Sequence, residues 1–484
     1  MDTDSTRWLK LRSGSDIRAT ETQLTDDTCE KIGYAFAVML AERLRTTPDQ
    51  LAIAVGRDGR DSGRRVLSAL IRGITAADSD VIDGGLCALP ALFDMAVRDA
   101  EPVSGAVMVT SDEDQPGRTG FKFITSKGGL AEADVALMLR MAAASEVPER
   151  LVTRLNPMEG YRDYLKARAA ELLADDALKP LLGLYLVVDV RTGGGAFFAG
   201  LMEDLGADVE RLGEGDPRDL EAAVPAYGAD MGFRFTPDSS RATIVDPAGS
   251  PVDGNRLIAM MSAMLLEKKP GATIVTDSVT STGLSAFIAE WGGVHYRFKR
   301  GYRSVIEEAV RLNAETIDCP LAIETTGHAA FRENHFLDDG IYLALRIACE
   351  ALDRKREGQT VFSLIDGLAE PVEALSLRLN ILDGKDPAAA CQEAVEIILS
   401  HTLEDPAWQM APDSREGVRI TFNLDGGVNN AWFQLRMSVH DPIMVLNAES
   451  DVPGGVKRIL RALYELLKGT ELIDMEPLRA AIEG

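Results

Sequence analysis

Three adjacent acidic residues lie in a loop between two segments that read as β-strands. The stretch 105–123 has the sequence GAVMVTSDEDQPGRTGFKF, in which Gly105–Val109 is short and apolar and Phe121–Phe123 alternates like a second strand. The carboxylates of residues 112–114 repel one another unless solvent, a metal ion or nearby Lys and Arg side chains offset their charge. A solvated acidic turn is the plain interpretation, and a chemical role requires partners from elsewhere in the chain.

Three further loops combine hydroxyl, acidic and basic side chains. They are TPDSSR (236–241), ETTGH (324–328) and RMSVHDP (436–442). Arg436 and Ser438 are two residues apart, so both can point to one side of a strand and grip one phosphate; the plain alternative is an exposed arginine on a sheet. Glu324 and His328 flank small residues and bring two hydrogen-bonding side chains to one loop tip, although a lone histidine is usually structural.

The amino-terminal segment RSGSDIR (12–18) reads as a glycine-and-serine loop ending in Arg18. Such a loop can hold an anion through its backbone N–H groups and the arginine, or it can be a simple turn.

The elements that must position these loops repeat along the chain. A strand, a loop, a helix and a second strand follow one another in three segments, which begin at residues 51, 183 and 272. This repetition predicts three α/β domains of one architecture, each with its functional loop at the carboxyl ends of its strands. From about residue 370 the runs VEALSLRL, VRITFNL and AWFQLRMSV alternate and the helix GVKRILRALYELLKG follows, which predicts an α+β domain on an antiparallel sheet.

Length and charge limit the class of protein. A chain of 484 residues is too long for one core and predicts roughly three or four domains. The formal charge of −25 argues against nucleic acid or an anionic membrane as the main partner. The five cysteines are scattered and indicate neither disulfides nor a zinc site, and no apolar run suggests a signal or a membrane span. A reducing cytoplasm is the expected location.

Together with GSDIR at 14–18 and GRDGRDSG at 56–63, the four loops resemble those of the α-D-phosphohexomutase family, the phosphoglucomutases and phosphomannomutases. The similarity covers essentially the whole chain and is densest in AIETTGHAAFRENHFLDDGIYL (322–343). It implies a heart-shaped α/β fold of three similar α/β/α domains and a C-terminal α+β domain, with a cleft between the four loops. There the family moves a phosphoryl group between the 1- and 6-positions of a hexose through a phosphoserine and a magnesium ion. The expected domains are residues 1–156 (catalytic loop), 157–252 (metal loop), 253–368 (sugar loop) and 369–484 (phosphate binding).

The catalytic loop departs from the family pattern. Aligned back from GFKF, the position of the family's phosphoserine is Asp112, the neighbouring histidine position is Glu113, and Ser111 falls one place early. Lys122 after this loop and Arg18 in the first loop match the family and are expected to serve catalysis.

The metal loop departs as well. The three aspartate positions of the family's DGDGDR-like loop read Thr236, Asp238 and Ser240, so one carboxylate of three remains. Mg²⁺ prefers carboxylate, phosphate and water oxygens, so this loop is expected to bind it poorly.

Two arrangements for Asp112 remain open. It could form a different hard-metal site with Asp238, helped by Glu113 or Asp114, or it could pair with Arg241 or Lys122 as a fixed negative charge. We favour the pairing because it needs no further ligand.

The positions that bind substrate in the family are retained. They are Arg241, Arg303, Glu324, Thr326, His328, Arg436 and Ser438. The resemblance therefore implies a protein that binds a hexose phosphate of the glucose or mannose type, with lost or altered mutase chemistry, as a homodimer or paired with an active relative. The alternatives are an active mutase that uses Asp112 or Ser111 as the phosphoryl carrier, and an interaction protein with a vestigial cleft.

Overall fold

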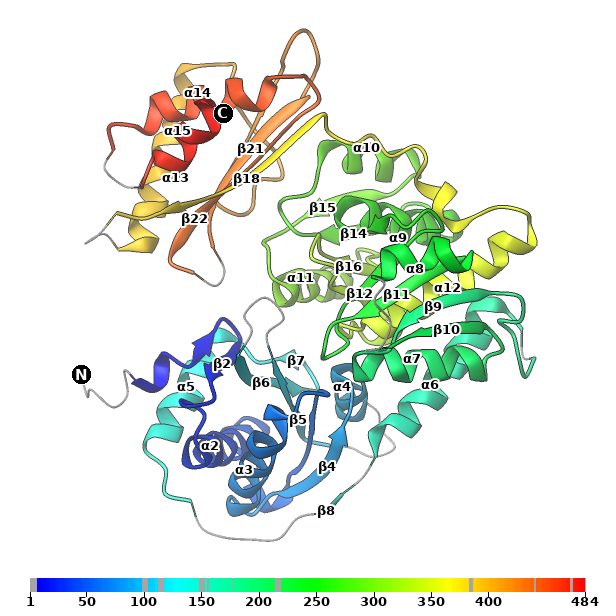
Figure 1. Cartoon of the computed structure of the whole chain (residues 1–484). Helices are drawn as coiled ribbons and strands as arrows, with labels where there is room; N and C mark the ends of the chain where they lie inside the picture. Colours follow the sequence, from blue (N-terminus) through cyan, green and yellow to red (C-terminus); the bar gives the residue numbers. More distant parts are fainter. Residues whose placement is uncertain are drawn as a thin grey trace. The chain divides into compact units, whose positions relative to one another are not determined.

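The computed structural model describes residues 7–97, 103–111, 117–147, 153–154, 156–175, 177–213, 219–382, 386–438, 441–470 and 473–483. The chain divides into two compact units, and Figure 1 labels helices and strands of both along the chain. Unit 1 comprises residues 1–252 and 327–361, and unit 2 comprises residues 253–326 and 362–484.

The first sheet of unit 1 has eight strands in the order β1-β2-β6-β5-β3-β4-β8, with β7 paired to β6. The strands are β1 (Arg12–Ser13), β2 (Asp16–Thr20), β3 (Ala52–Arg57), β4 (Asp80–Leu86), β5 (Gly105–Ser111), β6 (Arg118–Thr125), β7 (Gly128–Gly129) and β8 (Thr153–Arg154). The helices are α2 (Asp26–Leu44), α3 (Ser62–Ala76), α4 (Leu89–Val97) and α5 (Glu132–Ala143). Every residue of β5 is buried, as its continuous apolar sequence predicts for a strand covered on both faces.

The second sheet of unit 1 runs in the order β10-β9-β11-β12-β13. Its strands are β9 (Tyr185–Asp189), β10 (Asp208–Leu212), β11 (Met231–Phe235), β12 (Ala242–Val245) and β13 (Pro251–Val252), and β17 (Ala329–Phe331) lies in the returning segment. The helices are α6 (Pro157–Leu173), α7 (Gly193–Asp204), α8 (Leu220–Tyr227) and α12 (Gly340–Arg356). Asp339 caps α12 by accepting from the Tyr342 N–H at 2.8 Å, and it also accepts the Tyr161 hydroxyl of α6 at 2.7 Å, so one buried carboxylate joins the two helices.

Unit 2 contains a parallel set of strands and an antiparallel sheet. β14 (Thr273–Thr276) pairs in parallel with β15 (Val294–Arg297) on one side and β16 (Leu321–Ile323) on the other. The antiparallel sheet has the order β18-β22-β21-β20-β19, with β18 (Glu373–Asn380), β19 (Gln409–Met410), β20 (Val418–Phe422), β21 (Ala431–Met437) and β22 (Ile443–Ser450). The helices are α9 (Gly254–Lys268), α10 (Thr282–Glu290), α11 (Tyr302–Ala314), α13 (Pro387–Glu404), α14 (Gly455–Leu467) and α15 (Glu476–Glu483).

A buried arginine connects the two parts of unit 2. Arg419 of β20 lies over the ring of Trp432 at 3.6 Å from its centre, and its guanidinium donates to the carbonyls of Ser278 and Thr280 after β14. Backbone carbonyls and an aromatic face thus stabilise the charge, and the nearby carboxylates of Asp413, Glu449 and Asp277 also act on it.

The predicted architecture is confirmed. In three places a strand is followed by a helix and a parallel neighbour, and a third parallel strand pairs on the other side: β4-β3-β5, β10-β9-β11 and β15-β14-β16. The C-terminal sheet is antiparallel, as its alternating sequence predicts. One local expectation is wrong: Arg18 is not at the end of a loop but within β2, because Gly14 adopts a positive φ of 59° and lets β1 and β2 form a tight hairpin.

Candidate functional site

Three of the polar loops follow equivalent strands, each paired in parallel beside a central strand: Ser111 is the last residue of β5, residues 236–241 join β11 to β12, and Glu324 follows β16. Ser438 follows β21 of the antiparallel sheet. Asp112, Glu113 and Asp114 lie outside the described residues, so their predicted roles and pairings stay predictions.

A buried ion pair is the central feature of the loop 236–241. The Lys122 ammonium lies 2.7 Å from Oδ2 of Asp238, and the two side chains are only 11% and 9% exposed. Lys122 projects from β6, where Phe121 and Phe123 on either side of it enter the hydrophobic core. Alternation along the strand therefore turns the lysine to the other face of the sheet. The pairing joins the lysine that follows the acidic loop to the carboxylate of the predicted metal loop.

The second oxygen of Asp238 is also fully engaged. Oδ1 accepts from the Thr236 hydroxyl at 2.9 Å, and from the hydroxyl and the backbone N–H of Ser240 at 2.9 and 3.2 Å. Burial alone would raise the pKa of Asp238, but the charge and hydrogen bond of Lys122 and the two donors of Ser240 hold that pKa far below its usual value. The carboxylate is thus ionised and surrounded by donors.

The loop conformation is fixed by close backbone contacts within unit 1. Ser239 has a positive φ of 64°, the Leu89 N–H donates to the Asp238 carbonyl, and the Gly340 N–H donates to the Ser239 carbonyl. Gly194 at the start of α7 is required here, since a Cβ at that position would lie 1.9 Å from Oγ of Ser239. Two helix starts and a glycine therefore hold Asp238 in place.

These residues do not fit a magnesium ion. Mg²⁺ requires near-octahedral oxygen ligands, usually including carboxylates. Thr236 and Ser240 offer hydroxyls that already donate to Asp238, and the remaining carboxylate oxygen faces an ammonium. Among the described residues, no group of three or more His, Cys, Asp or Glu side chains could hold a metal ion.

The other predicted residues of unit 1 have defined partners. His328 directs Nδ1 toward both carboxylate oxygens of Asp338 at 2.8 Å, and its backbone forms a bridge with Arg241. The sequence interpretation missed Asp338, although its place in the FLDDG segment after the histidine is a usable signal. The backbone bridge brings the predicted sugar-binding histidine next to Arg241.

The residues around β5 and β2 are held by local contacts. The Ser111 N–H donates to Oδ2 of Asp58 at 2.9 Å, and Ser111 itself is 8% exposed. Arg18 donates to the Ile17 carbonyl and pairs with Asp16 at 3.2 Å. Asp58, in the predicted GRDGRDSG motif, therefore fixes the strand end that leads into the acidic loop.

In unit 2, Glu324 is held at the start of α11. Its Oε1 accepts from the Gly301 N–H at 2.6 Å and its Oε2 accepts from the Thr326 hydroxyl at 3.1 Å. Arg303, in the first turn of α11, pairs with Glu307 along the helix at 2.5 Å. Glu324 is thus fixed at a helix terminus and accepts from Thr326, whereas the predicted meeting of Glu324 and His328 at one loop tip stays a prediction.

Arg436 is buried at the end of β21 and is only 4% exposed. Its guanidinium donates to the Met437 carbonyl at 3.1 Å, while Nε lies 3.8 Å from Oε2 of Glu416 and has no hydrogen-bond partner among the described residues. Burial lowers the pKa of Arg436, and Glu416 opposes that shift. Ser438, two residues on, accepts from the Asp441 N–H at 3.3 Å.

Glu416 was not predicted from the sequence. Its Oε2 accepts from the Ser278 hydroxyl at 2.5 Å and from the Arg300 N–H at 3.1 Å. Another carboxylate, the fully buried Asp277, lies 4.0 Å from the Arg300 guanidinium. Glu416 therefore contacts both Arg436 and Arg300, and Asp277 lies near the Arg300 guanidinium.

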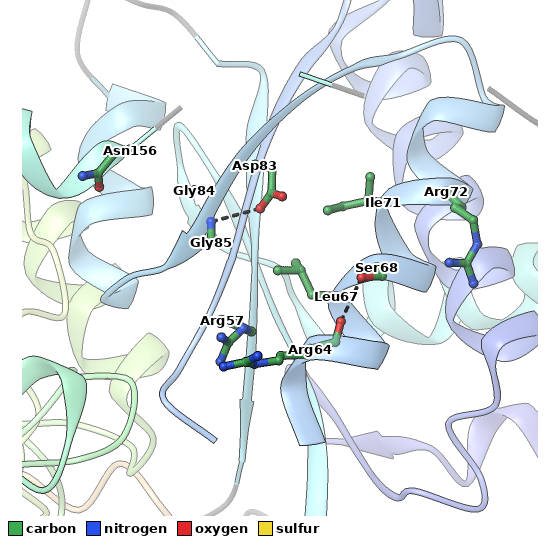
Figure 2. Close-up of a pocket in the computed structure, with 10 residues that line it drawn as sticks. All are labelled: Arg57, Arg64, Leu67, Ser68, Ile71, Arg72, Asp83, Gly84, Gly85 and Asn156. Atoms are coloured by element: carbon green, nitrogen blue, oxygen red, sulfur yellow. Dashed lines mark hydrogen bonds between the residues drawn. The ribbon is translucent and has the colours of Figure 1, made fainter. Parts of the chain in front are cut away.

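A cavity of about 950 Å³ lies elsewhere in unit 1, between α3 and β4. Its lining includes Arg57, Arg64, Asp83 and Asn156. Figure 2 shows Arg57 and Arg64 pointing toward the same end of the cavity from β3 and α3. None of the predicted site residues lines it.

Comparison with known proteins identifies the family. Residues 10–147 match phosphoglucomutase/phosphomannomutase, alpha/beta/alpha domain I, and residues 253–371 match domain III, together more than half of the chain. A phosphomannomutase/phosphoglucomutase of Pseudomonas aeruginosa is 28% identical over 468 residues, or 93% of each chain. The chain belongs to the phosphoglucomutase/phosphomannomutase family, the α-D-phosphohexomutases.

Solved structures share the fold. A phosphoglucomutase/phosphomannomutase family protein from Burkholderia thailandensis superposes with a TM-score of 0.75 at 23% identity, covering 98% of this chain and all of its own. The N-acetylphosphoglucosamine mutase of Aspergillus fumigatus, solved with GlcNAc-6P and magnesium, gives a TM-score of 0.58 at 10% identity, covering 96% and 99%. Among the described residues, no helix is long and apolar enough to cross a membrane.

Proposed function

We propose that this protein binds a hexose phosphate and has lost or altered the mutase chemistry of its family. The observation that supports binding is Arg436, a buried guanidinium whose Nε lacks an acceptor among the described residues. A buried N–H without a partner is costly, and an anionic ligand offers it one. A phosphate is the natural ligand for an arginine followed two residues later by a serine.

The proposal of altered chemistry rests on the metal loop. Phosphoryl transfer depends on cations that absorb the charge of the equatorial oxygens. Asp238 is already saturated by Lys122, Thr236 and Ser240. With an aspartate at the phosphoserine position as well, we place the protein among sugar phosphate binders rather than efficient mutases.

The choice of hexose phosphate follows from the family and from one neighbour. The Aspergillus fumigatus enzyme was solved with GlcNAc-6P, a hexose 6-phosphate. Glu324 and Thr326 provide an acceptor and a hydroxyl fixed at a helix start, which suits sugar hydroxyls. We therefore propose glucose 6-phosphate or mannose 6-phosphate as the first ligands to try.

The test is calorimetric titration with glucose 6-phosphate, mannose 6-phosphate and inorganic phosphate. We expect saturable binding that Arg436→Ala weakens at least about 30-fold, or about 2 kcal/mol, since hydrogen bonds to charged groups are worth about 1.5–3 kcal/mol. Arg436→Lys should recover only part of this because lysine lacks the planar fork. Arg479→Ala, in an exposed i,i+3 pair on α15, is the matched control and should bind like the wild type. Equal binding by wild type and Arg436→Ala would overturn the proposal.

The second candidate is an active mutase that uses Ser111 or Asp112 as the phosphoryl carrier. The shared fold and the retained binding residues favour it. Ser111, however, is the last residue of β5 and nearly buried, which argues against it as an accessible nucleophile. Turnover that Asp112→Ala or Ser111→Ala abolishes would establish this second function.

A further inference from the structure

We infer that Lys122 takes the place of a metal ion: its ammonium supplies the positive charge at the 236–241 loop, which therefore works without a divalent cation. The inference rests on the contact between Lys122 and Asp238 and does not depend on which ligand the protein binds.

Lys122 places a fixed positive charge at the loop. Lys122 reaches the loop from β6, in a different sheet of unit 1, and its Nζ approaches Asp238 to 2.7 Å. Both side chains are almost completely buried, so the ammonium is an integral part of the loop's surroundings and not a surface charge that solvent could replace.

The charge of Lys122 matches the charge of the loop. The loop contributes one carboxylate, and one ammonium neutralises it. The family pattern of three aspartates would carry three negative charges and would need more positive charge than one lysine provides. The replacement of two aspartates by Thr236 and Ser240 and the ion pair of Lys122 are therefore mutually consistent changes.

The two hydroxyl groups of the loop already have an acceptor. Thr236 and Ser240 donate to Oδ1 of Asp238, so they serve as hydrogen-bond donors to the carboxylate and not as ligands. A hydroxyl that donates to Asp238 directs its hydrogen toward that oxygen. A dication placed there would have to displace these donors and would lie beside the Lys122 ammonium, which repels it.

Electron paramagnetic resonance measures the amount of Mn²⁺ that each protein binds. The Mn²⁺ bound at this loop is the amount bound by a protein minus the amount bound by the same protein with Asp238→Asn. We expect no difference for the wild type up to about 1 mM Mn²⁺, a range in which weak protein sites fill. Wild-type Mn²⁺ binding that Asp238→Asn removes would overturn the inference.

A gain-of-function variant gives the second arm. Thr236→Asp/Ser240→Asp/Lys122→Met restores three carboxylates and removes the ammonium, and we expect it to bind Mn²⁺ at least about 10-fold more tightly than the wild type, since carboxylate count raises affinity. Thr236→Asp/Ser240→Asp with Lys122 retained is the matched control and should bind less than the triple variant. Equal binding by the two would contradict the role of Lys122. If the acidic variants do not fold, the wild-type measurement still decides, because its outcome does not require them.

The readout is metal occupancy, so this test can fail while hexose phosphate binding succeeds, and the reverse also holds.

Discussion

The Lys122 ammonium and the Asp238 carboxylate form a buried ion pair at 2.7 Å. Lys122→Met leaves the Asp238 charge buried without its counter-ion, and we expect a loss of about 3 kcal/mol in the free energy of unfolding, the range for breaking a buried pair. The urea midpoint measures this loss.

The double variant provides the control for the ion pair. Lys122→Met/Asp238→Asn removes both charges and should be more stable than Lys122→Met alone, because the unpaired carboxylate is gone. If the double variant is less stable than Lys122→Met by as much as Asp238→Asn alone destabilises the wild type, the two residues are not coupled.

Substitution of Gly194 tests the close packing of α7 against the loop 236–241. Gly194→Ala places a methyl group 1.9 Å from Oγ of Ser239, so the loop must shift, and we expect a loss of about 1–3 kcal/mol in stability. Gly193→Ala, one residue earlier in the same first turn of α7, meets no atom within 4 Å and should leave the melting temperature unchanged or slightly raised. Equal melting temperatures for the two variants would contradict the close packing of this loop.

Substitution of Glu416 tests how its negative charge affects phosphate binding at Arg436. Its carboxylate lies 3.8 Å from Nε of Arg436 and repels any phosphate that binds there. Glu416→Gln keeps an oxygen that can accept from Ser278 and Arg300 but removes the charge, and we expect roughly fivefold tighter binding of glucose 6-phosphate, or about 1 kcal/mol, at low ionic strength. Calorimetry at two salt concentrations checks this, and unchanged or weaker binding would show that Glu416 does not compete with the ligand.

The pH dependence of stability should carry the signature of Glu449. Burial raises the pKa of Glu449 to about 7, and this outweighs the opposing effects of Arg419 and of the Trp432 N–H that it accepts at 3.0 Å. The folded state therefore holds this proton more tightly than the unfolded chain, so the free energy of unfolding falls as pH rises from about 4.5 to about 7.

The matched variant for this prediction is Glu449→Gln, which keeps the acceptor for Trp432 without a titrating group. Between pH 4.5 and 7.5 the wild type should lose on the order of 3 kcal/mol of stability relative to the variant, as linkage requires for a pKa raised this far. Urea unfolding followed by tryptophan fluorescence measures the difference. Parallel pH profiles for the two proteins would contradict the assignment.

Much of the fold could be predicted because local sequence patterns and tertiary structure agree. The apolar run at Gly105–Val109 is buried on both faces, and the alternating segments after residue 370 form an antiparallel sheet. Arg18 was misplaced because a Gly-Ser turn reads equally well as a loop and as a hairpin, and only the pairing of β2 with β6 decides between them.

The sequence singled out residues for the candidate site but gave no indication of their partners in space. Lys122 and Asp238 were both singled out, yet a separation of more than a hundred residues gives no signal that they touch. Glu416 was missed for the same reason, because Ser278 and Arg300, which donate to it, lie more than a hundred residues away in the sequence. Asp338 lies only ten residues from His328 and was overlooked despite that signal. From the sequence, Thr236 and Ser240 show only that these two positions carry no carboxylate. The structure adds that their hydroxyls donate to Asp238.

The most direct test of the account is mutase turnover of glucose 1-phosphate with glucose 1,6-bisphosphate and saturating Mg²⁺. Because the metal loop is neutralised by Lys122, we predict a rate at least about 1,000-fold below ordinary enzyme values of about 10 s⁻¹, equivalent to about 4 kcal/mol of lost transition-state stabilisation. The same preparation should bind glucose 6-phosphate by calorimetry. Turnover above about 1 s⁻¹ that requires Mg²⁺ and is lost in Asp238→Asn would contradict the central claim.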